Sequence, residues 1–199
     1  MDSPGSPPGM DSWTADLFLA WAERQEKGRY ELVDGQIRAM APERAPHALV
    51  KYNVVKALEA AIKRAGLPCM AFVDGLGVKI DETTVFEPDA LVNCGGRITK
   101  DTIIAPNPVI VAEVISPSSG DRDLVRKYFR YFRHPAIYHY LIVDIGSRSV
   151  LRHSRGADGK IISGGTEHGE LLALAPSGLE VSTAAFFEGL DEFSDAEEA

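Results

Sequence analysis

Cysteine is scarce in this chain, and long apolar runs are missing. Cys69 and Cys94 are the only two cysteines in 199 residues. They are too few for a disulfide framework or a cysteine zinc site, so we expect reduced thiols and a cytoplasmic protein. No window approaches about 18 uncharged apolar residues, which predicts no transmembrane helix and no membrane partner. The first residues, MDSPGSPPGMDS, lack the basic and apolar regions of a signal peptide, in keeping with that location.

An excess of positive charge is also missing, because the formal net charge is −8. Residues 1–12 hold two acids and no bases, and residues 188–199 hold six acids and no bases. Removing these eight acids from the 29 leaves 21, equal to the 21 Lys and Arg, so the segment 13–187 is formally neutral. We expect a disordered tail over 1–12, a single domain over 13–187 and an acidic tail over 188–199.

The first third of the chain predicts two helices separated by a hairpin. Thr14 is a typical N-cap for a helix that runs to about Lys27. Asp34-Gly35, between two short apolar segments, is the strongest short hairpin signal. Apolar residues at helical spacing over 47–66, with Gly66 at the end, predict a longer second helix.

Strands predominate in the remainder of the chain. The run 108–116 is continuously apolar, as is typical of a strand covered on both faces. Helices that interrupt a mixed sheet indicate an α/β or α+β fold, with a central mixed β-sheet flanked by helices. We expect further strands over 69–73, 77–81, 84–93 (with Pro88 inside), 138–145 and 149–154, weaker strands over 160–163, 170–174 and 179–182, a helix over 121–133, and a short last helix that begins at Thr183.

Glu113 lies in the middle of the apolar strand 108–116. An unpaired carboxylate there would cost several kcal/mol or would be neutralised, so such acids are usually paired, metal-bound or catalytic. Asp89, in the strand before it, supplies a second acid. Two carboxylates on neighbouring strands form a hard oxygen site for Mg²⁺ or Mn²⁺, and without a metal one pKa would rise. The plainer alternatives are a satisfied buried Glu113 and a turn acid beside Pro88.

The helix over 121–133 brings bases to the same region. Its residues carry five bases against two acids, a net charge of +3. Lys127 lies beside the apolar stripe and can face the sheet, while Arg126 and Arg130 face solvent. A surface ion pair with Asp123, four residues earlier, is the routine alternative for Lys127. The stripe itself is formed by Leu124, Val125, Tyr128 and Phe132.

The order of several motifs resembles the Uma-two family of endonucleases, formerly a domain of unknown function. The resemblance is carried by YELVDG at 30–35, PD at 88–89, VAEVISPSSGDRDLVRKYFRYF at 111–132 and YLIVD at 140–144, and it spans about residues 14–155. The family is classed with the restriction-endonuclease-like PD-(D/E)XK fold. One departure is HPAI at 134–137, where the family commonly has GV, in a turn outside the expected site.

The resemblance implies a catalytic centre for phosphodiester hydrolysis. Asp89 and Glu113 match the motif acids and would hold Mg²⁺ or Mn²⁺ together with the backbone carbonyl of Val114. The lysine that the fold usually keeps two residues after the second acid is replaced by Ile115. Lys127, on the next helix, is implied as its substitute, where it would position water or stabilise charge on the phosphate.

Two further residues are implied as parts of this centre. Glu31 of YELVDG matches a recurring family acid that would complete the metal shell. His47 falls where the family often has histidine, as an accessory residue, and a polar residue at a helix N-terminus is the alternative reading. Tyr128 and Tyr131 are expected to be packing residues.

The implied function is a metal-dependent endonuclease that hydrolyses DNA. Arg122, Arg126 and Arg130 would meet the phosphate backbone, with salt-dependent affinity and no reading of sequence. A homodimer would suit cleavage of both strands. Two alternatives stay open: a catalytically inactive nucleic-acid or protein binding module that keeps the nuclease fold, and a metal-free hydrolase with paired carboxylates.

Overall fold

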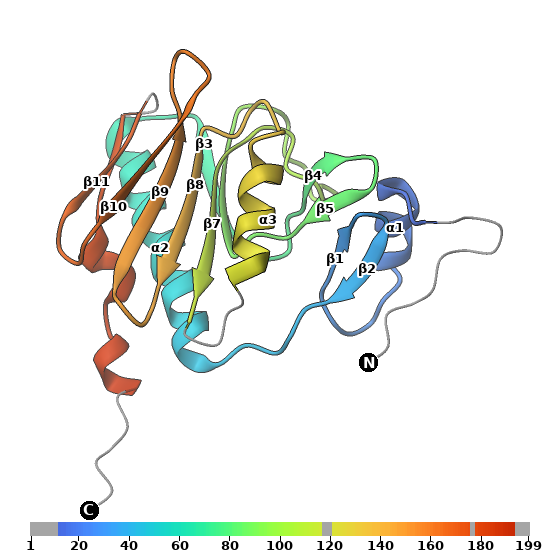
Figure 1. Cartoon of the computed structure of the whole chain (residues 1–199), viewed down its shortest axis with the longest axis horizontal. Coiled ribbons are helices and arrows are strands. Elements are labelled where there is room, and N and C mark those ends of the chain that lie inside the picture. The colour runs from blue at the N-terminus through green and yellow to red at the C-terminus, as the bar shows by residue number, and fades with distance from the viewer. Residues whose placement is uncertain (1–11, 117–120, 176–177, 194–199) are drawn as a thin grey trace, which may run out of the picture.

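The computed structural model describes residues 12–116, 121–175 and 178–193 (Figure 1). The elements are, in chain order, α1 (Ala15–Ala22), β1 (Tyr30–Val33), β2 (Gln36–Ala39), α2 (Ala45–Ala65), β3 (Cys69–Val73), β4 (Val78–Asp81), β5 (Thr84–Phe86), β6 (Ala90–Cys94), β7 (Pro108–Ile115), α3 (Asp121–Tyr131), β8 (His139–Asp144), β9 (Ser149–Arg155), β10 (Ile161–Thr166), β11 (Leu171–Leu174), β12 (Leu179–Ser182), and the 3₁₀ helices η1 (Thr183–Phe187) and η2 (Leu190–Phe193).

The strands form a large central sheet and two smaller ones. The central sheet has the order β10-β9-β8-β7-β6-β3, with β7 and β8 parallel and the other neighbours antiparallel. A four-stranded antiparallel sheet has the order β2-β1-β5-β4, and β11 pairs with β12. Figure 1 shows α2 and α3 on opposite sides of the central sheet. The predicted α+β fold with a mixed sheet flanked by helices is confirmed.

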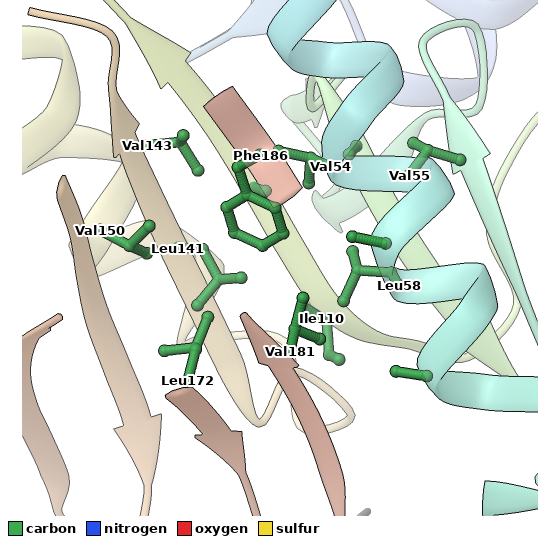
Figure 2. Close-up of a cluster of buried hydrophobic side chains, with 14 of the residues drawn as sticks. Val54, Val55, Leu58, Ile110, Leu141, Val143, Val150, Leu172, Val181 and Phe186 are labelled. Atoms are coloured by element: carbon green, nitrogen blue, oxygen red, sulfur yellow. The ribbon is translucent and has the colours of Figure 1, made fainter. Parts of the chain in front are cut away.

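One face of the central sheet is covered by α2, β11, β12 and η1. Strand alternation sends Ile110, Ala112 and Val114 of β7 to this face, where they join one buried apolar cluster. Phe186 of η1 is fully buried there, with Val54 of α2 among the side chains around it (Figure 2). This is the larger part of the hydrophobic core.

The opposite face is covered by α3 and the four-stranded sheet. Val111 of β7 and Tyr140 of β8 point to this side, where they pack with Phe86 of β5 and Tyr131 of α3. Phe18 of α1 packs on the outer side of the four-stranded sheet. The region between the two sheets is therefore a second core, which includes β7, the strand that carries Glu113.

The two first helices and the hairpin follow their sequence signals, with one difference in length. Thr14 caps α1 and accepts a hydrogen bond from the Leu17 N–H at 3.4 Å. Asp34 and Gly35 both adopt positive φ, 52° and 73°, as a two-residue hairpin turn requires. Helix α1 ends at Ala22 rather than near Lys27, because residues 23–28 offer no apolar side chain to bury and tighten into 3₁₀-type turns.

The single strand predicted over 84–93 is wrong. Residues 84–86 form β5 in the four-stranded sheet, and residues 90–94 form β6 in the central sheet. Pro88 lies between them, where it has no N–H for a strand ladder and favours a break. Asp89 therefore lies at the point where the chain passes from one sheet to the other.

The prediction of reduced thiols is also wrong. Cys69 and Cys94 form a disulfide, with a sequence separation of 25 residues. They lie directly opposite each other in the β3–β6 pairing, which brings two distant cysteines together. This register is a tertiary property that cysteine counting does not reveal.

Helix α3 differs from its predicted stripe. Val125 is 58% exposed, whereas Tyr131 is fully buried and packs between Phe86 and Tyr140. The predicted last helix is the 3₁₀ helix η1, with Ser182 rather than Thr183 at its N-cap.

The two predicted tails lie mostly outside the described residues. The predicted tail over 1–12 falls, except for Ser12, outside the described residues, as do residues 194–199. Residues 188–193 are described, and Leu190 of η2 is buried in the α2-side core. In the described part of the chain, no helix is both long enough and apolar enough to span a membrane.

Candidate active site

Glu113 lies in β7 on the face that is covered by α3, and it is 7% exposed. The Lys127 ammonium donates to its Oε1 atom at 2.9 Å. The Tyr131 hydroxyl donates to the same oxygen at 2.6 Å. Among the described residues no hydrogen bond reaches Oε2 of Glu113, so one carboxylate oxygen is held by α3 and the other is left for a ligand.

Lys127 points from α3 toward the sheets, as predicted. It is 5% exposed and donates to Oε1 of Glu31 in β1 at 3.1 Å, in addition to Glu113. Its ammonium also lies 5.4 Å from the centre of the Phe86 ring. Lys127 is thus buried rather than exposed at the surface, and the alternative of an ion pair with Asp123 involves a side chain outside the described part.

Tyr131 contributes more than packing. Its hydroxyl bonds to Glu113, and burial, followed by the charges of Glu113 and Glu31, raises its pKa well above the usual value. The Tyr131 hydroxyl therefore stays protonated and remains a donor. The sequence could have indicated this role, because Tyr131 follows Lys127 by four residues and the two side chains therefore share one face of α3.

Burial raises the pKa of Glu113 to about 8. The ammonium of Lys127 opposes this rise, and the nearby charges of Asp89 and Glu31 add to it. The carboxyl groups of Glu31, Asp89 and Glu113 thus repel one another when they are ionised. A cation in their midst would favour the ionised form of all three.

Asp89 is tied directly to the strand of Glu113. Its Oδ2 atom accepts a hydrogen bond from the backbone N–H of Val114 at 2.7 Å. Its Oδ1 atom lies 2.8 Å from the ammonium of Lys51 in α2. The break at Pro88 thus brings Asp89 to β7, close enough for its charge to act on Glu113.

His47 contacts the backbone carbonyl of Val114, which the family resemblance implies as a metal ligand. Its Nε2 atom lies 2.6 Å from the carbonyl oxygen of Val114 and 3.9 Å from Oδ2 of Asp89. Its Nδ1 atom is buried and has no hydrogen-bond partner in the described part of the chain. The first turn of α2 therefore places an imidazole beside both predicted metal-binding oxygens.

Sequence reasoning missed Lys51, Glu43 and Asp74. The Lys51 ammonium contacts a carboxylate oxygen of Glu43 and lies 2.6 Å from Oδ1 of Asp74. Lys51 follows His47 by four residues on the same face of the amphipathic helix α2, but this spacing alone does not show that the lysine is buried. Glu43 and Asp74 lie in loops, whose approach to α2 depends on the tertiary fold.

The donor atoms around His47 fit a divalent cation. Ligand atoms of Glu43, His47 and Asp89 lie within 4.8 Å of one another. They line a cavity of about 680 Å³ together with Ser116 and Ile145. Carboxylate and carbonyl oxygens with one imidazole suit Mg²⁺ or Mn²⁺ better than a soft metal.

The three arginines proposed to contact phosphate are differently placed. Arg130 has a side chain that is only 14% exposed, and it donates to Thr84 Oγ1 at 2.8 Å and pairs with Asp34. It therefore braces α3 against the four-stranded sheet rather than facing solvent. Arg126 is half-buried, and the side chain of Arg122 lies outside the described part.

Comparison with known proteins gives consistent matches. A model of the Uma2 family, described as "Putative restriction endonuclease", matches residues 15–184. An uncharacterized protein of Synechocystis sp. is 27% identical over 189 residues, covering 94% of this chain and 97% of the relative.

A similar solved structure supports the same fold. The crystal structure of a "putative nuclease belonging to DUF820" from Anabaena variabilis superposes with a TM-score of 0.69 at 17% identity, over 87% of this chain and 97% of that chain. Because the family model covers most of the chain, the protein belongs to the Uma2 family.

Proposed function

We propose that this protein is a metal-dependent endonuclease that hydrolyses phosphodiester bonds in DNA, with its active site in one domain over residues 13–187. The observation that carries the proposal is the contact between Lys127 and Glu113 at 2.9 Å. Ile115 leaves the usual lysine position without a base, and α3 supplies the ammonium from another element. The family match and the nuclease-like fold support the same reaction class.

Asp89, Glu113 and the carbonyl of Val114 would hold the metal, with His47 as a further ligand. A bound Mg²⁺ or Mn²⁺ supplies Lewis-acid polarisation of the phosphate and lowers the pKa of water. The chain prepares these donors in advance, because the Val114 N–H fixes Asp89 and the α3 side chains fix Glu113.

Lys127 is the residue best placed to act on the reacting phosphate. An ammonium held between two carboxylates keeps its position, and it can stabilise negative charge that develops on phosphate oxygens. Glu31 acts through Lys127, since its Oε1 atom accepts from both that ammonium and the Glu87 N–H. We assign it a positioning role in addition to its proposed place near the metal.

The charge of the site explains why a nucleic acid would need a cation to enter. Among the described residues the ion-pair network of the site has two parts and contains six acids and three bases, a formal charge of −3 when every acid is ionised. A phosphodiester is repelled by that charge, and a divalent cation offsets most of it. The network consists of Glu31, Glu43, Asp74, Glu87, Asp89 and Glu113 with Arg29, Lys51 and Lys127.

The test is conversion of supercoiled plasmid to open circles with MgCl₂, with MnCl₂ and with EDTA, because a circle has no ends for an exonuclease. We expect nicking that requires the metal and falls at least about 100-fold in Asp89→Asn, Glu113→Gln and Lys127→Met. Lys56→Met is the matched control, since Lys56 is an exposed base on α2 that pairs with Glu188 at 3.3 Å. Plasmid left intact with both metals would contradict the proposal.

A non-catalytic binding module is the second candidate. The observation in its favour is that the buried bases of the site are already paired with acids, as in a structural network. Such a module would bind DNA or protein without hydrolysis, and its affinity would be unchanged by EDTA. Activity that persists in excess EDTA would instead support a metal-free hydrolase.

A further inference from the structure

Lys51 occupies an unusual place in the site. Its side chain is 1% exposed, at the second turn of α2, and its ammonium is surrounded by oxygens of Glu43, Asp74 and Asp89. An ammonium has three N–H donors, and here three carboxylates accept them. Three carboxylates around one ammonium stabilise its positive charge.

The surroundings of Lys51 resemble a cation site more than a surface ion pair. Arg29 contacts two of the same oxygens, Oδ1 of Asp74 at 2.8 Å and Oε1 of Glu43 at 3.0 Å. Three carboxylates that converge on one point are the donor set of a divalent metal. In this chain the ammonium of Lys51, which is covalently part of the protein, occupies that position.

Asp89 separates this internal cation from the proposed metal position. Its Oδ1 atom faces Lys51, and its Oδ2 atom faces the Val114 N–H and His47. Carboxylates that lie between two metals bridge them with their two oxygens in two-metal nucleases. Here one of the two oxygens is committed to an ammonium.

We propose that Lys51 takes the place of a second metal ion and makes this a one-metal centre. The inference rests on the proposed function, since it concerns the number of ions that the active site holds. The physical reason is local: the Lys51 ammonium occupies the point on which Glu43, Asp74 and Asp89 converge, and its loss would leave these three carboxylates to hold a second cation. Lys51 is thus a positioning residue, which orients Asp89 and limits metal occupancy.

The test counts Mn²⁺ ions per chain by titration calorimetry, with free Mn²⁺ followed independently by its electron paramagnetic resonance signal. The wild type is expected to bind one ion, and Lys51→Met is expected to bind two. Asp74→Asn added to Lys51→Met is expected to return the count to one, because Asp74 lies on the Lys51 side of Asp89 and contacts neither Val114 nor His47. Lys56→Met, on the exposed face of the same helix, is expected to keep one ion.

The possible outcomes separate the two proposals. Zero ions in the wild type would overturn the metal-dependent function itself. Two ions in the wild type would leave that function standing and overturn the role of Lys51, as would a single ion in a folded Lys51→Met variant. If Lys51→Met does not fold, the wild-type count decides the matter, and Lys51→Arg, which keeps the charge, is expected to bind one ion.

Discussion

The two faces of the central sheet use the same strands for different purposes. On the α2 side, residues such as Val54, Leu141 and Phe186 form a dry apolar cluster. On the α3 side, apolar packing around Tyr140 is interrupted by Lys127 and Glu113, both buried. Alternate residues of β7 therefore serve stability on one side and charge on the other.

The difference shows how a rigid support and a charged centre can share one strand. Apolar burial on the α2 side contributes folding free energy at about 25 cal/mol per Å². Buried ion pairs on the α3 side contribute little net stability, because desolvation offsets their attraction. The charges on the α3 side are thus better explained by function than by folding, and single substitutions on each side can test that division.

The largest effect on stability is expected on the apolar side. Phe186→Ala removes a fully buried ring and leaves a cavity, which should lower the free energy of unfolding by about 4 kcal/mol. Urea unfolding followed by circular dichroism measures this loss. At a low temperature, where the Phe186→Ala protein is folded, its affinity for the metal should equal that of the wild type. A lower affinity would show that the two faces of the sheet are not independent.

Lys127→Met should cost about 3 kcal/mol, because it leaves Glu31 and Glu113 buried without their shared cation. The same urea experiment measures it. Adding Glu31→Gln and Glu113→Gln to Lys127→Met should recover most of the loss, since no buried charge is then left unpaired. A triple variant as unstable as Lys127→Met would contradict the view that the desolvation cost of the buried charges on the α3 side offsets their attraction.

His139 of β8 is a titratable residue on the apolar, α2 side of the central sheet. Burial, with a smaller contribution from the charge of Arg152, lowers its pKa from 6.5 to about 4, although a hydrogen bond with the backbone of Ala175 acts in the opposite direction. The unfolded chain takes up this proton below about pH 6.5 and the folded chain does not, so stability present above that pH is lost as pH falls toward 4. Between pH 7 and pH 4.5 the loss assigned to His139 should be about 2.5 kcal/mol.

The measurement for His139 is the difference between wild type and His139→Gln in urea unfolding at the two pH values. Glutamine keeps a hydrogen-bonding side chain toward Ser154, which lies 2.8 Å from Nδ1, and it has no proton to gain. An equal loss of stability in both proteins would show that His139 does not titrate as described.

The smallest of these effects is expected for Tyr131→Phe. The change removes only the hydroxyl that donates to Glu113 at 2.6 Å, and hydrogen bonds to charged groups contribute about 2 kcal/mol. The ring contacts with Phe86 and Tyr140 remain, so the packing is preserved. Thermal unfolding compares the variant with wild type, and an unchanged midpoint would mean that Lys127 alone satisfies Glu113.

Much of the fold could be predicted from local signals. Thr14, Asp34-Gly35 and Gly66 mark boundaries through chemistry that acts within a few residues. The apolar run of β7 predicted a strand covered on both faces, and the structure confirms it. Errors arose where distant residues decide, as at Pro88, where two sheets meet, and at Cys69 and Cys94, which the β3–β6 register joins.

The candidate site followed the same rule. Asp89, Glu113 and Lys127 could be nominated because acids in an apolar context and a family motif mark them in the sequence. Lys51 was missed because a lysine in an amphipathic helix is ordinarily exposed, and only packing reveals that α2 buries it among three carboxylates. Glu43 and Asp74 reach the site through loops, which carry no periodic signal.

We propose that Lys127 replaces the lysine missing at position 115, and plasmid nicking by a variant with a relocated lysine tests this replacement. Ile115 shares the face of β7 with Glu113, two residues away. We expect Lys127→Met to abolish Mg²⁺-dependent nicking and the double variant Ile115→Lys, Lys127→Met to nick at least about 10-fold faster than Lys127→Met alone. A folded Lys127→Met protein that nicks as fast as the wild type would contradict the account.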